Sequence, residues 1–184
     1  MDRRVKYTKQ IIRQTLLELM QKKDINKITV TEICNLADVN RATFYKYYLD
    51  VFDLLEQIED ELLIEIKNTL LKENEDKSVK EKMRDVINTV KDNEDIFRVL
   101  LGENARKDFL LNILYFARTL CFEAWKNTFK NIDENDFNYL FTYTSNGVIA
   151  IIQLWVKNGC NETVDEITSL IYEIIKDGNS IFVK

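Results

Sequence analysis

The sequence contains no proline and no histidine, and it has only four glycines among 184 residues. Because proline and glycine are the residues that most often interrupt helices, a chain with so few of them is predicted to be helical throughout. Without histidine, acid–base catalysis would fall to carboxylates or lysines, and a Cys/His zinc site is excluded. The sequence also has no glycine-rich loop that could cradle a phosphate. These absences argue against an enzyme.

Cysteine is scarce as well. Cys34, Cys121 and Cys160 are odd in number and widely spaced, so they predict no disulfide framework. Each is expected to be a small buried apolar residue in a protein from a reducing compartment. The N-terminal residues hold no apolar run long enough for a signal peptide, and no internal run is long enough to span a membrane. We therefore expect a cytoplasmic protein with no membrane partner, no metal and no cofactor.

Charge is unevenly distributed along the chain. Residues 1–48 carry ten basic and five acidic side chains, a net charge of +5, whereas the whole chain carries −5 and the remaining residues therefore −10. A basic N-terminal segment on an acidic body indicates that the segment meets a polyanion and the body does not. Chance scatter of charge is the alternative at this stage.

Apolar side chains recur at helical spacing between short polar breaks, which predicts nine helices and no strand, an all-α fold. The first helix is predicted over residues 8–23. A second begins at a capping box, Thr29 to Glu32, and reaches residue 37. Asn40 caps a third helix over residues 41–48, and Asp50 caps a fourth.

The second half of the chain carries equally clear helix signals. Capping boxes at residues 78–81 and 163–166 open two helices, and Asp133 opens another. The remaining predictions are a short helix from Asn93 to near Gly102, a helix over residues 105–129, a polar loop over 72–78, and helix ends at Gly159 and Gly178.

The second and third predicted helices are joined by only a few residues, as in a helix-turn-helix. Four apolar residues are spaced to bury together and hold the pair: Ile33, Leu36, Val39 and Phe44. Their burial would leave the outer face of the third helix free to enter a DNA groove. That face carries Arg41, Ala42, Thr43, Tyr45, Lys46 and Tyr47.

The residue types on this face suit DNA. Arg41 and Lys46 can donate to guanine or to phosphate, while small side chains such as Ala42 permit close approach to a thymine methyl. The tyrosine hydroxyls can donate to phosphates and fix the register without reading sequence. Basic residues at the start of the chain could add phosphate or minor-groove contacts; they are Arg3, Arg4, Lys6 and Lys9.

The stretch ITVTEICNLADVNRATFYKYY, continuing into LDVFDLL, resembles the DNA-binding signature of the TetR family of transcriptional regulators. The match is dense over residues 8–55. The resemblance implies a nine-helix fold with a helix-turn-helix domain over residues 1–49 and a helical dimerisation and effector domain over 50–184. It implies a phosphate contact for Tyr45 and base-facing positions for Thr31, Arg41, Ala42, Thr43, Lys46 and Tyr47.

Two positions depart from the family pattern. Asp38 stands in the turn where the family usually has glycine, and aspartate tolerates a left-handed backbone better than most residues. Val51 stands at the start of the fourth helix where the family often has lysine, so one phosphate contact is in question. The backbone N–H groups at the start of that helix could still bind phosphate.

The C-terminal half resembles a branch of the family that includes regulators of dihydroxyacetone kinase operons, some of which are activators. A dimer is predicted through the last two helices, whose apolar spacing fits helix packing, with burial inside the monomer as the alternative. The predicted interface residues are Gly147, Ile151, Trp155, Ile167, Ile171 and Ile174. Abundant aromatic residues are expected to be mainly core, with some lining an effector pocket; the candidates are Phe97, Phe116, Trp125, Phe141 and Tyr143.

The resemblance therefore implies a regulator that binds a palindromic operator as a homodimer and acts as a repressor released by a small-molecule effector. Two alternatives remain open for the regulator: an activator, or a protein that depends on a co-regulator. A helical interaction protein that has lost DNA binding is a third alternative. An enzyme is the reading that the residues support least.

Overall fold

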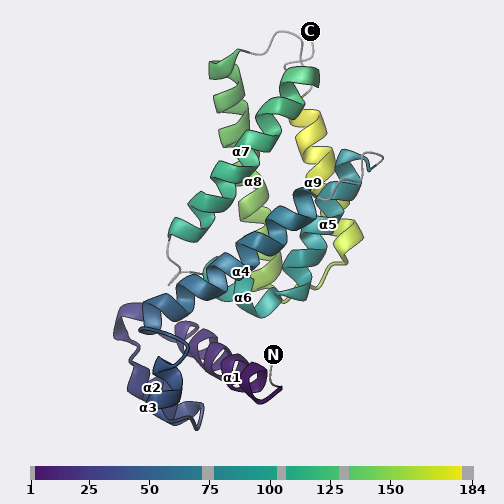
Figure 1. Ribbon diagram of the computed structural model, residues 1–184. Helices are drawn as coiled ribbons and strands as arrows, with labels where there is room; N and C mark the ends of the chain where they lie inside the picture. Colours follow the sequence, from purple (N-terminus) through teal and green to yellow (C-terminus); the bar gives the residue numbers. More distant parts are fainter. Residues whose placement is uncertain (1–2, 72–76, 103–106, 129–132, 180–184) are drawn as a thin grey trace. The chain divides into compact units, whose positions relative to one another are not determined.

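The computed structural model describes residues 3–71, 77–102, 107–128 and 133–179. Within these ranges the chain forms nine α-helices, one short 3-10 helix and no strand, which confirms the predicted all-α fold (Figure 1). The helices are α1 (Arg3–Met20), α2 (Val30–Leu36), α3 (Arg41–Tyr45), α4 (Val51–Leu71), α5 (Val79–Asp92), α6 (Glu94–Leu100), α7 (Lys107–Thr128), α8 (Glu134–Lys157) and α9 (Val164–Asn179), with the 3-10 helix η1 at Ile25–Lys27.

The helices belong to two compact units. Unit 1 comprises Met1–Glu65 and Asp95–Arg106, and unit 2 comprises Ile66–Glu94 and Lys107–Lys184. The helix α4 therefore contributes its longer, N-terminal part to unit 1 and its last turns to unit 2. The domain boundary predicted between residues 49 and 50 stays a prediction.

Helix α1 is longer at its start than its pattern predicted. It begins at Arg3 rather than near residue 8. Thr8 thus lies inside the helix, where its hydroxyl donates to the Arg4 carbonyl at 2.9 Å. It also ends earlier, at Met20 rather than residue 23. The chain then turns through η1, whose cap Asp24 accepts from the Asn26 amide at 2.8 Å.

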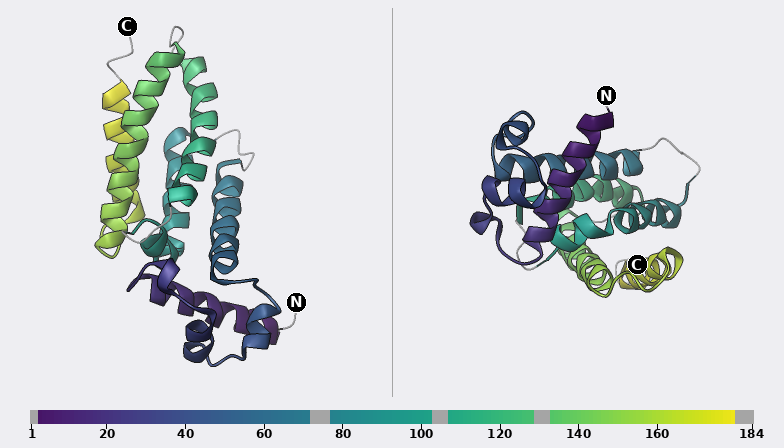
Figure 2. Two further views of the ribbon diagram at one scale, coloured as in Figure 1. Left: turned by 90° about the vertical axis from the view of Figure 1, so that its left-hand side faces the viewer. Right: turned by 90° about the horizontal axis from the view of Figure 1, so that it is seen from below.

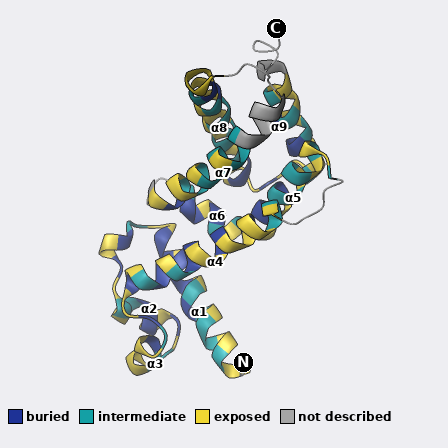
Figure 3. Ribbon diagram, turned by 45° about the horizontal axis from the view of Figure 1, so that its top comes forward, coloured by how far each residue is buried: buried dark blue, intermediate teal, exposed yellow. Residues whose placement is uncertain are grey.

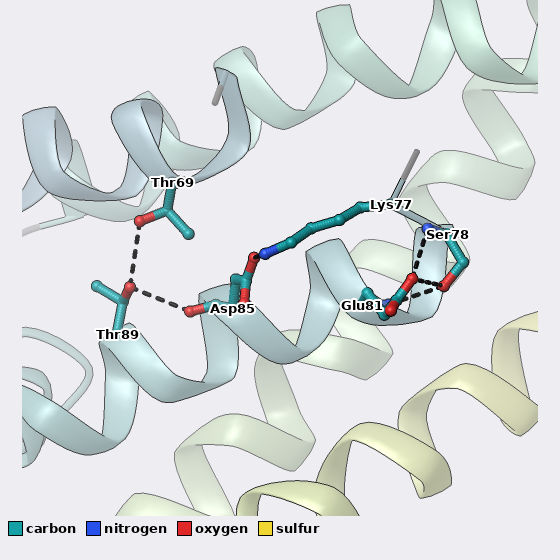
Figure 4. A network of polar contacts seen from close by, with 6 residues as sticks. All are labelled: Thr69, Lys77, Ser78, Glu81, Asp85 and Thr89. Carbon is teal, nitrogen blue, oxygen red and sulfur yellow. Dashed lines mark hydrogen bonds and ion pairs between the residues drawn. The ribbon is translucent and has the colours of Figure 1, made fainter. Parts of the chain in front are cut away.

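Side-chain caps start most of the later helices where the sequence predicted them. Asn40 accepts from the Ala42 amide at 2.8 Å, and Asp133 accepts from the Asp136 amide at 2.8 Å. A complete capping box joins Ser78 and Glu81, shown in Figure 4. Reciprocal bonds likewise join Thr163 and Glu166. Each cap satisfies amides that the first helical turn leaves without an intrahelical acceptor.

The capping box predicted at Thr29 forms only in part. The Thr29 hydroxyl accepts from the Glu32 amide at 3.2 Å. The Glu32 carboxylate instead accepts from Lys23 Nζ, with both oxygens at 2.7 Å. A cation nine residues earlier in the chain thus competes successfully for the carboxylate that the local pattern assigned to the helix start.

Unit 2 is built by packing α5 and α8 against α9 and α7 against α8 (Figures 1 and 2). Its core residues include Ile87, Phe137, Trp155 and Ile171. Figure 3 shows that exposed residues lie on the outer sides of these helices. The tight connection from α8 to α9 is fixed by Trp155, whose Nε1 donates to the Glu162 carbonyl at 3.1 Å.

The helix ends in unit 2 agree with the sequence to within a residue. Gly159 follows α8 with φ +81° and is followed by Cys160 with φ +49°, so the predicted glycine stop is confirmed. Helix α9 continues one residue past Gly178 to Asn179. The predicted start at residue 105 and end at residue 129 of one helix, and most of the loop at 72–78, lie outside the described residues.

Cys34 and Cys160 are buried as expected, and Cys121 is half-buried.

A polar network joins the end of α4 to α5 within unit 2 (Figure 4). The Thr69 and Thr89 hydroxyls lie 3.4 Å apart, and Thr89 also donates to the Asp85 carbonyl at 3.2 Å. The Asp85 carboxylate pairs with Lys77 at 2.6 Å. Since Lys77 and Asp85 are both partly exposed, their pairing contributes little stability, and the network mainly fixes the local geometry of α5.

Candidate nucleic-acid interface

The turn between α2 and α3 contains a residue in the left-handed conformation. Asp38 has φ +52°, in the left-handed region where the family pattern has glycine. The next residue, Val39, donates its amide to the Cys34 carbonyl at 3.0 Å and closes the end of α2. The turn predicted from the sequence therefore forms without glycine.

Of the four apolar residues predicted to hold α2 and α3 together, two are buried, Val39 is half-buried and Leu36 is exposed. Ile33 and Phe44 are fully buried, as expected. Leu36 was predicted to be buried but is 64% exposed, because the inward face of α2 passes through Cys34 and Ala37 instead. At about 100° per residue, Ala37 and Cys34 lie about 40° and 100° to one side of Ile33, and Leu36 lies about 60° to the other side. The buried face is centred near Ala37, so Leu36 falls outside it.

Helix α3 is anchored by aromatic rings on its inner side. The buried Phe44 ring contacts Tyr45 edge-on at 5.7 Å and Tyr48 at 5.4 Å between ring centroids. Tyr48 is also buried, and its burial raises the pKa of its hydroxyl to about 12. Tyr48 therefore packs in the core and not on the outer face. Asn40 and these rings hold a helix of five residues that could not stand alone.

The outer face of α3 carries most of the residues that the sequence assigned to DNA. Arg41, Ala42, Tyr45 and Lys46 are exposed, and Thr43 and Tyr47 are partly exposed. Thr31 is exposed on α2. A hydrogen bond with Tyr45, one turn further along the helix, raises the pKa of the Arg41 guanidinium. The face therefore presents two cations and a tyrosine hydroxyl without a covering element in the described residues of this unit.

The start of α1 lies beside this face. Lys9 Nζ lies 5.5 Å from the Tyr47 ring centroid and 5.7 Å from that of Tyr48, and Lys46 Nζ lies 5.7 Å from the Tyr47 ring. These cation–π contacts bring the cations of two helices to one tyrosine. An open groove of about 440 Å³ runs between the elements; its lining residues are Arg4, Val5, Thr8, Asp38, Val39, Asn40, Thr43, Lys46 and Tyr47. Arg3, also at the start of α1, is exposed.

Two polar residues in the first two turns of α4, Asp53 and Gln57, were not predicted to belong to the site. Asp53 accepts from the Leu49 amide at 2.7 Å and donates its own amide to Asp50 at 2.9 Å. Gln57 Nε2 lies 3.2 Å from Asp53 and 3.4 Å from the Tyr47 carbonyl. The spacing of Asp50 and Asp53 could have indicated the role of Asp53, since a cap followed three residues later by an acid is a helix-start signature. Val51, which replaces the family's lysine, is buried.

The residues predicted to line an effector pocket are distributed over both units. Phe97 is buried in unit 1, whereas the other four lie in unit 2. Phe116 and Phe141 are half-buried, Tyr143 is 70% exposed, and the side chain of Trp125 lies outside the described residues. In unit 2, Phe141 stacks on Phe137 with centroids 5.8 Å apart.

The residues predicted for the dimer interface divide into two groups. Trp155, Ile167 and Ile171 are buried within the single chain, which is the alternative that the sequence left open for this seam. Gly147 and Ile174 are exposed, and Ile151 is half-buried.

In the described residues, no helix has the length and apolarity needed to cross a membrane.

Comparison with known proteins identifies the family. Residues 77–177, over half of the chain, match the TetR-type family described as a transcriptional regulator C-terminal region. The chain belongs to the TetR family of transcriptional regulators. No curated protein matches it in sequence.

Several solved structures of regulatory proteins share the fold. A TetR transcriptional regulator from Streptococcus agalactiae has 23% identity and a TM-score of 0.65, covering 95% of this chain and 96% of its own. The dihydroxyacetone kinase operon activator DhaS has 18% identity and a TM-score of 0.62, covering 95% of this chain and 97% of its own. FadR from Bacillus subtilis, solved in complex with stearoyl-CoA, has 16% identity and a TM-score of 0.66, covering 92% and 98%.

Proposed function

We propose that this TetR regulator is a cytoplasmic, non-enzymatic protein that binds a palindromic DNA operator as a homodimer, with α3 of each protomer in the major groove. The observation that carries the proposal is the outer face of α3. Its two cations, Arg41 and Lys46, are exposed together, while Phe44 on the opposite side is fully buried. A helix anchored on one face and cationic on the other is what a recognition helix needs.

The proposed contacts follow from the side chains. Arg41 reads guanine, the Ala42 and Thr43 surface approaches the bases closely, and Tyr45 and Tyr47 donate to phosphates. Lys46 contacts a base or a phosphate, Thr31 approaches from α2, and Arg3, Arg4 and Lys9 add phosphate contacts from α1. The contacts between Lys9, Lys46 and the Tyr47 ring support this arrangement, because they hold cations from two helices beside the groove.

The proposed dimer uses exposed apolar residues of α8 and α9. On α8, Tyr139, Tyr143, Gly147 and Leu154 are exposed at spacings of four, four and seven residues, which places them along one side of the helix. On α9, Leu170 and Ile174 are exposed one turn apart. A contiguous apolar stripe of this kind is typical of an interface between copies of a protein.

Two protomers also give DNA recognition its reach. One short recognition helix contacts only a few base pairs, whereas two in a symmetric dimer read both halves of a palindrome. We propose further that the protein is a repressor released by a small molecule that binds unit 2 with different affinity in two states. The likeness to DhaS, which is described as an activator, favours activation as the second candidate.

DNA binding is tested by gel shift with genomic fragments that flank the chain's own coding sequence, alongside a mixed-sequence duplex. Arg41→Ala is expected to weaken binding to the specific fragment by about 1–3 kcal/mol and to relax its specificity. Tyr45→Phe is expected to weaken binding to both duplexes, with a smaller extra loss on the specific fragment because Tyr45 also holds Arg41. Arg84→Ala on α5 is the matched control. Failure of the unmodified chain to bind any fragment in a salt-sensitive way would refute the proposal.

Dimerisation is tested by sedimentation equilibrium. Tyr143→Glu and Leu170→Glu each place a charge in the proposed apolar stripe and are expected to shift the chain toward monomer. Ile64→Glu changes another exposed apolar residue, on α4, and is expected to leave the dimer intact. Equal behaviour of the three variants would contradict the assignment of the interface.

A further inference from the structure

Tyr47, the second residue after helix α3, has its backbone held on both sides. Its amide donates to the Phe44 carbonyl at 2.9 Å, and its carbonyl accepts from Gln57 Nε2 at 3.4 Å. The first bond extends the last turn of α3 and the second comes from α4, so two helices set the position of this residue. The side chain is half-buried, and its ring lies edge-on to the buried Tyr48 ring with centroids 6.4 Å apart. The Tyr47 ring therefore has a defined place between the core of unit 1 and solvent.

Two lysines from different segments lie beside this ring. Lys9 Nζ, on α1, is 5.5 Å from the Tyr47 ring centroid, and Lys46 Nζ, directly after α3, is 5.7 Å from it. Lys9 Nζ is also 5.7 Å from the Tyr48 ring centroid, so Lys9 has two rings where Lys46 has one. An ammonium group within about 6 Å of a ring centroid is attracted by the negative face of the ring. Tyr47 is thus the ring that the two cations share.

Bringing two ammonium groups to one ring has an electrostatic cost, because like charges repel. The attraction of the ring opposes this repulsion, and it also opposes the rotamer entropy that a long side chain loses when it is held. Lys23, by contrast, is held by a carboxylate, that of Glu32. Within the described residues neither Lys9 nor Lys46 has an ion-pair partner of this kind. Their charges are therefore gathered without being paired, and an anion beside the ring would relieve their repulsion.

The shared ring also borders the groove between α1 and α3. Tyr47 and Lys46 line one side of this groove, and Arg4 and Thr8 line it from α1. Cations and hydroxyl groups along a groove are the groups that contact a phosphate backbone. The position of the ring thus decides whether the ammonium groups of Lys9 and Lys46 stay at the edge of the groove or spread into solvent.

We propose that the Tyr47 ring is a positioning residue for DNA binding, which holds Lys9 and Lys46 together so that both ammonium groups meet the phosphate backbone. This inference rests on the proposed function and assigns to the ring of Tyr47 a part that is separate from the phosphate contact of its hydroxyl. It joins α1 to the recognition segment through a neutral side chain.

The salt dependence of binding tests the proposal, because it counts the cations that meet phosphate. The logarithm of the affinity falls with the logarithm of the salt concentration, with a slope of about 0.9 for each phosphate neutralised. Tyr47→Leu changes no charge but removes the shared ring, and is expected to lower this slope by about 0.9 to 1.8. Tyr47→Phe keeps the ring and is expected to leave the slope unchanged, although the loss of the hydroxyl weakens binding.

A second comparison shows whether the ring acts through the lysines. Lys9→Met/Lys46→Met removes both cations and is expected to lower the slope by about 1.8. Adding Tyr47→Leu to this double variant is expected to lower it no further, since the ring then has no cation to hold. Tyr7→Leu is the matched control: Tyr7 is on α1, 65% exposed, and among the described residues no cation lies over its ring.

Proton NMR of the chain without DNA gives an independent measurement. The ε-methylene protons of a lysine held over an aromatic face resonate upfield of their usual position. Those of Lys9 and Lys46 are expected to be shifted in the unmodified chain and in Tyr47→Phe, and the Lys46 signal is expected to return to its usual position in Tyr47→Leu. Far-ultraviolet circular dichroism and urea denaturation check that the variants fold.

Binding is measured by fluorescence anisotropy over a range of salt, with a labelled genomic fragment that flanks the chain's own coding sequence. A lower slope in Tyr47→Leu, but not in Tyr47→Phe or Tyr7→Leu, supports the inference. An unchanged slope in Tyr47→Leu overturns it, and so does an equal loss in Tyr47→Phe or a further loss in the triple variant. Lysine signals without an upfield shift in the unmodified chain also overturn it, even if Tyr47→Leu does not fold. These results leave the proposed function standing, whereas absence of DNA binding by the unmodified chain and by every variant overturns both.

Discussion

The left-handed residue in the helix-turn-helix offers a sharp test of how the turn is held. Asp38 has φ +52°, a conformation that costs most L-residues about 1–2 kcal/mol but glycine nothing. Aspartate is among the residues that tolerate it best. Replacing Asp38 with glycine relieves strain but increases the entropy of the unfolded chain, which offsets about 0.5–1 kcal/mol of the gain.

The expected order of stability at this position is therefore glycine and asparagine close to aspartate, then alanine, then valine. Asp38→Gly and Asp38→Asn are expected to lie within about 1 kcal/mol of the unmodified chain. Asp38→Ala is expected to lose about 1 kcal/mol and Asp38→Val about 2 kcal/mol, since a branched side chain crowds the left-handed backbone most. For a chain of this size, each kcal/mol corresponds to about 2–4 °C in Tm.

Urea denaturation followed by far-ultraviolet circular dichroism measures the order, and the same set at Asp60 provides the control. Asp60 is exposed in the middle of α4, where the backbone is helical. There alanine is expected to be the most stable substitution and glycine the least, by about 1 kcal/mol, the reverse of the order at Asp38. If Asp38→Ala and Asp38→Val unfold at the same urea concentration as the unmodified chain, the turn is not held in the left-handed conformation in solution.

Three further outcomes are expected. Phe44→Ala should lower the free energy of unfolding by about 3–5 kcal/mol in urea denaturation, because Phe44 is fully buried; a loss below 1 kcal/mol would contradict that packing. Tyr48 should still be protonated at pH 11 in an ultraviolet titration, whereas titration of every tyrosine near pH 10 would argue against its burial. Because folding raises the pKa of Tyr48 from 10 to about 12, its contribution to stability is complete below pH 10 and is lost as the pH rises through 12. Ser78→Ala should lower the free energy of unfolding by about 1 kcal/mol and return the lowered pKa of Glu81 toward its usual value. The variant should therefore lose less stability than the unmodified chain as the pH falls below 4.5. Parallel profiles of stability against pH would count against the capping box.

Local chemistry made the helix starts predictable. The caps at Asn40, Asp50, Ser78 and Asp133 form where the sequence placed them, because each needs only a side-chain oxygen and an amide two or three residues away. The all-α fold and the family were predictable for the same reason: the helix-turn-helix signature is dense and local. Such features do not depend on what packs against them.

Features that depend on neighbours across the chain were harder to predict. Leu36 was expected in the core because it is large and apolar, but the two helix positions that face inward belong to Cys34 and Ala37. Glu32 was expected to cap its own helix start, yet its carboxylate pairs with Lys23, in the turn that follows α1. Both outcomes follow from where α1 lies, which the sequence of α2 alone does not contain.

In the candidate site, too, the exposed side chains of α3 were predictable from the sequence, whereas a bond to another segment was not. The sequence placed Arg41, Tyr45 and Lys46 on the outer face of α3, and in the structure these side chains are exposed. Their roles in DNA binding stay predictions. The polar bridge through Asp53 and Gln57 was not anticipated, because it joins the end of one helical segment to the next through a backbone carbonyl. Periodicity describes which side chains share a face, but not which of them bond to the main chain.

Helix α4 has a consequence for how the protein unfolds. It is one continuous helix, yet Val51 to Glu65 belong to unit 1 and the turns from Ile66 belong to unit 2. Melting either unit therefore leaves the other holding a helix with a frayed, uncapped end, which raises the free energy of any half-unfolded state. The amides in the middle of α4 should exchange with solvent only when the whole chain opens, so that two units behave as a single cooperative foldon.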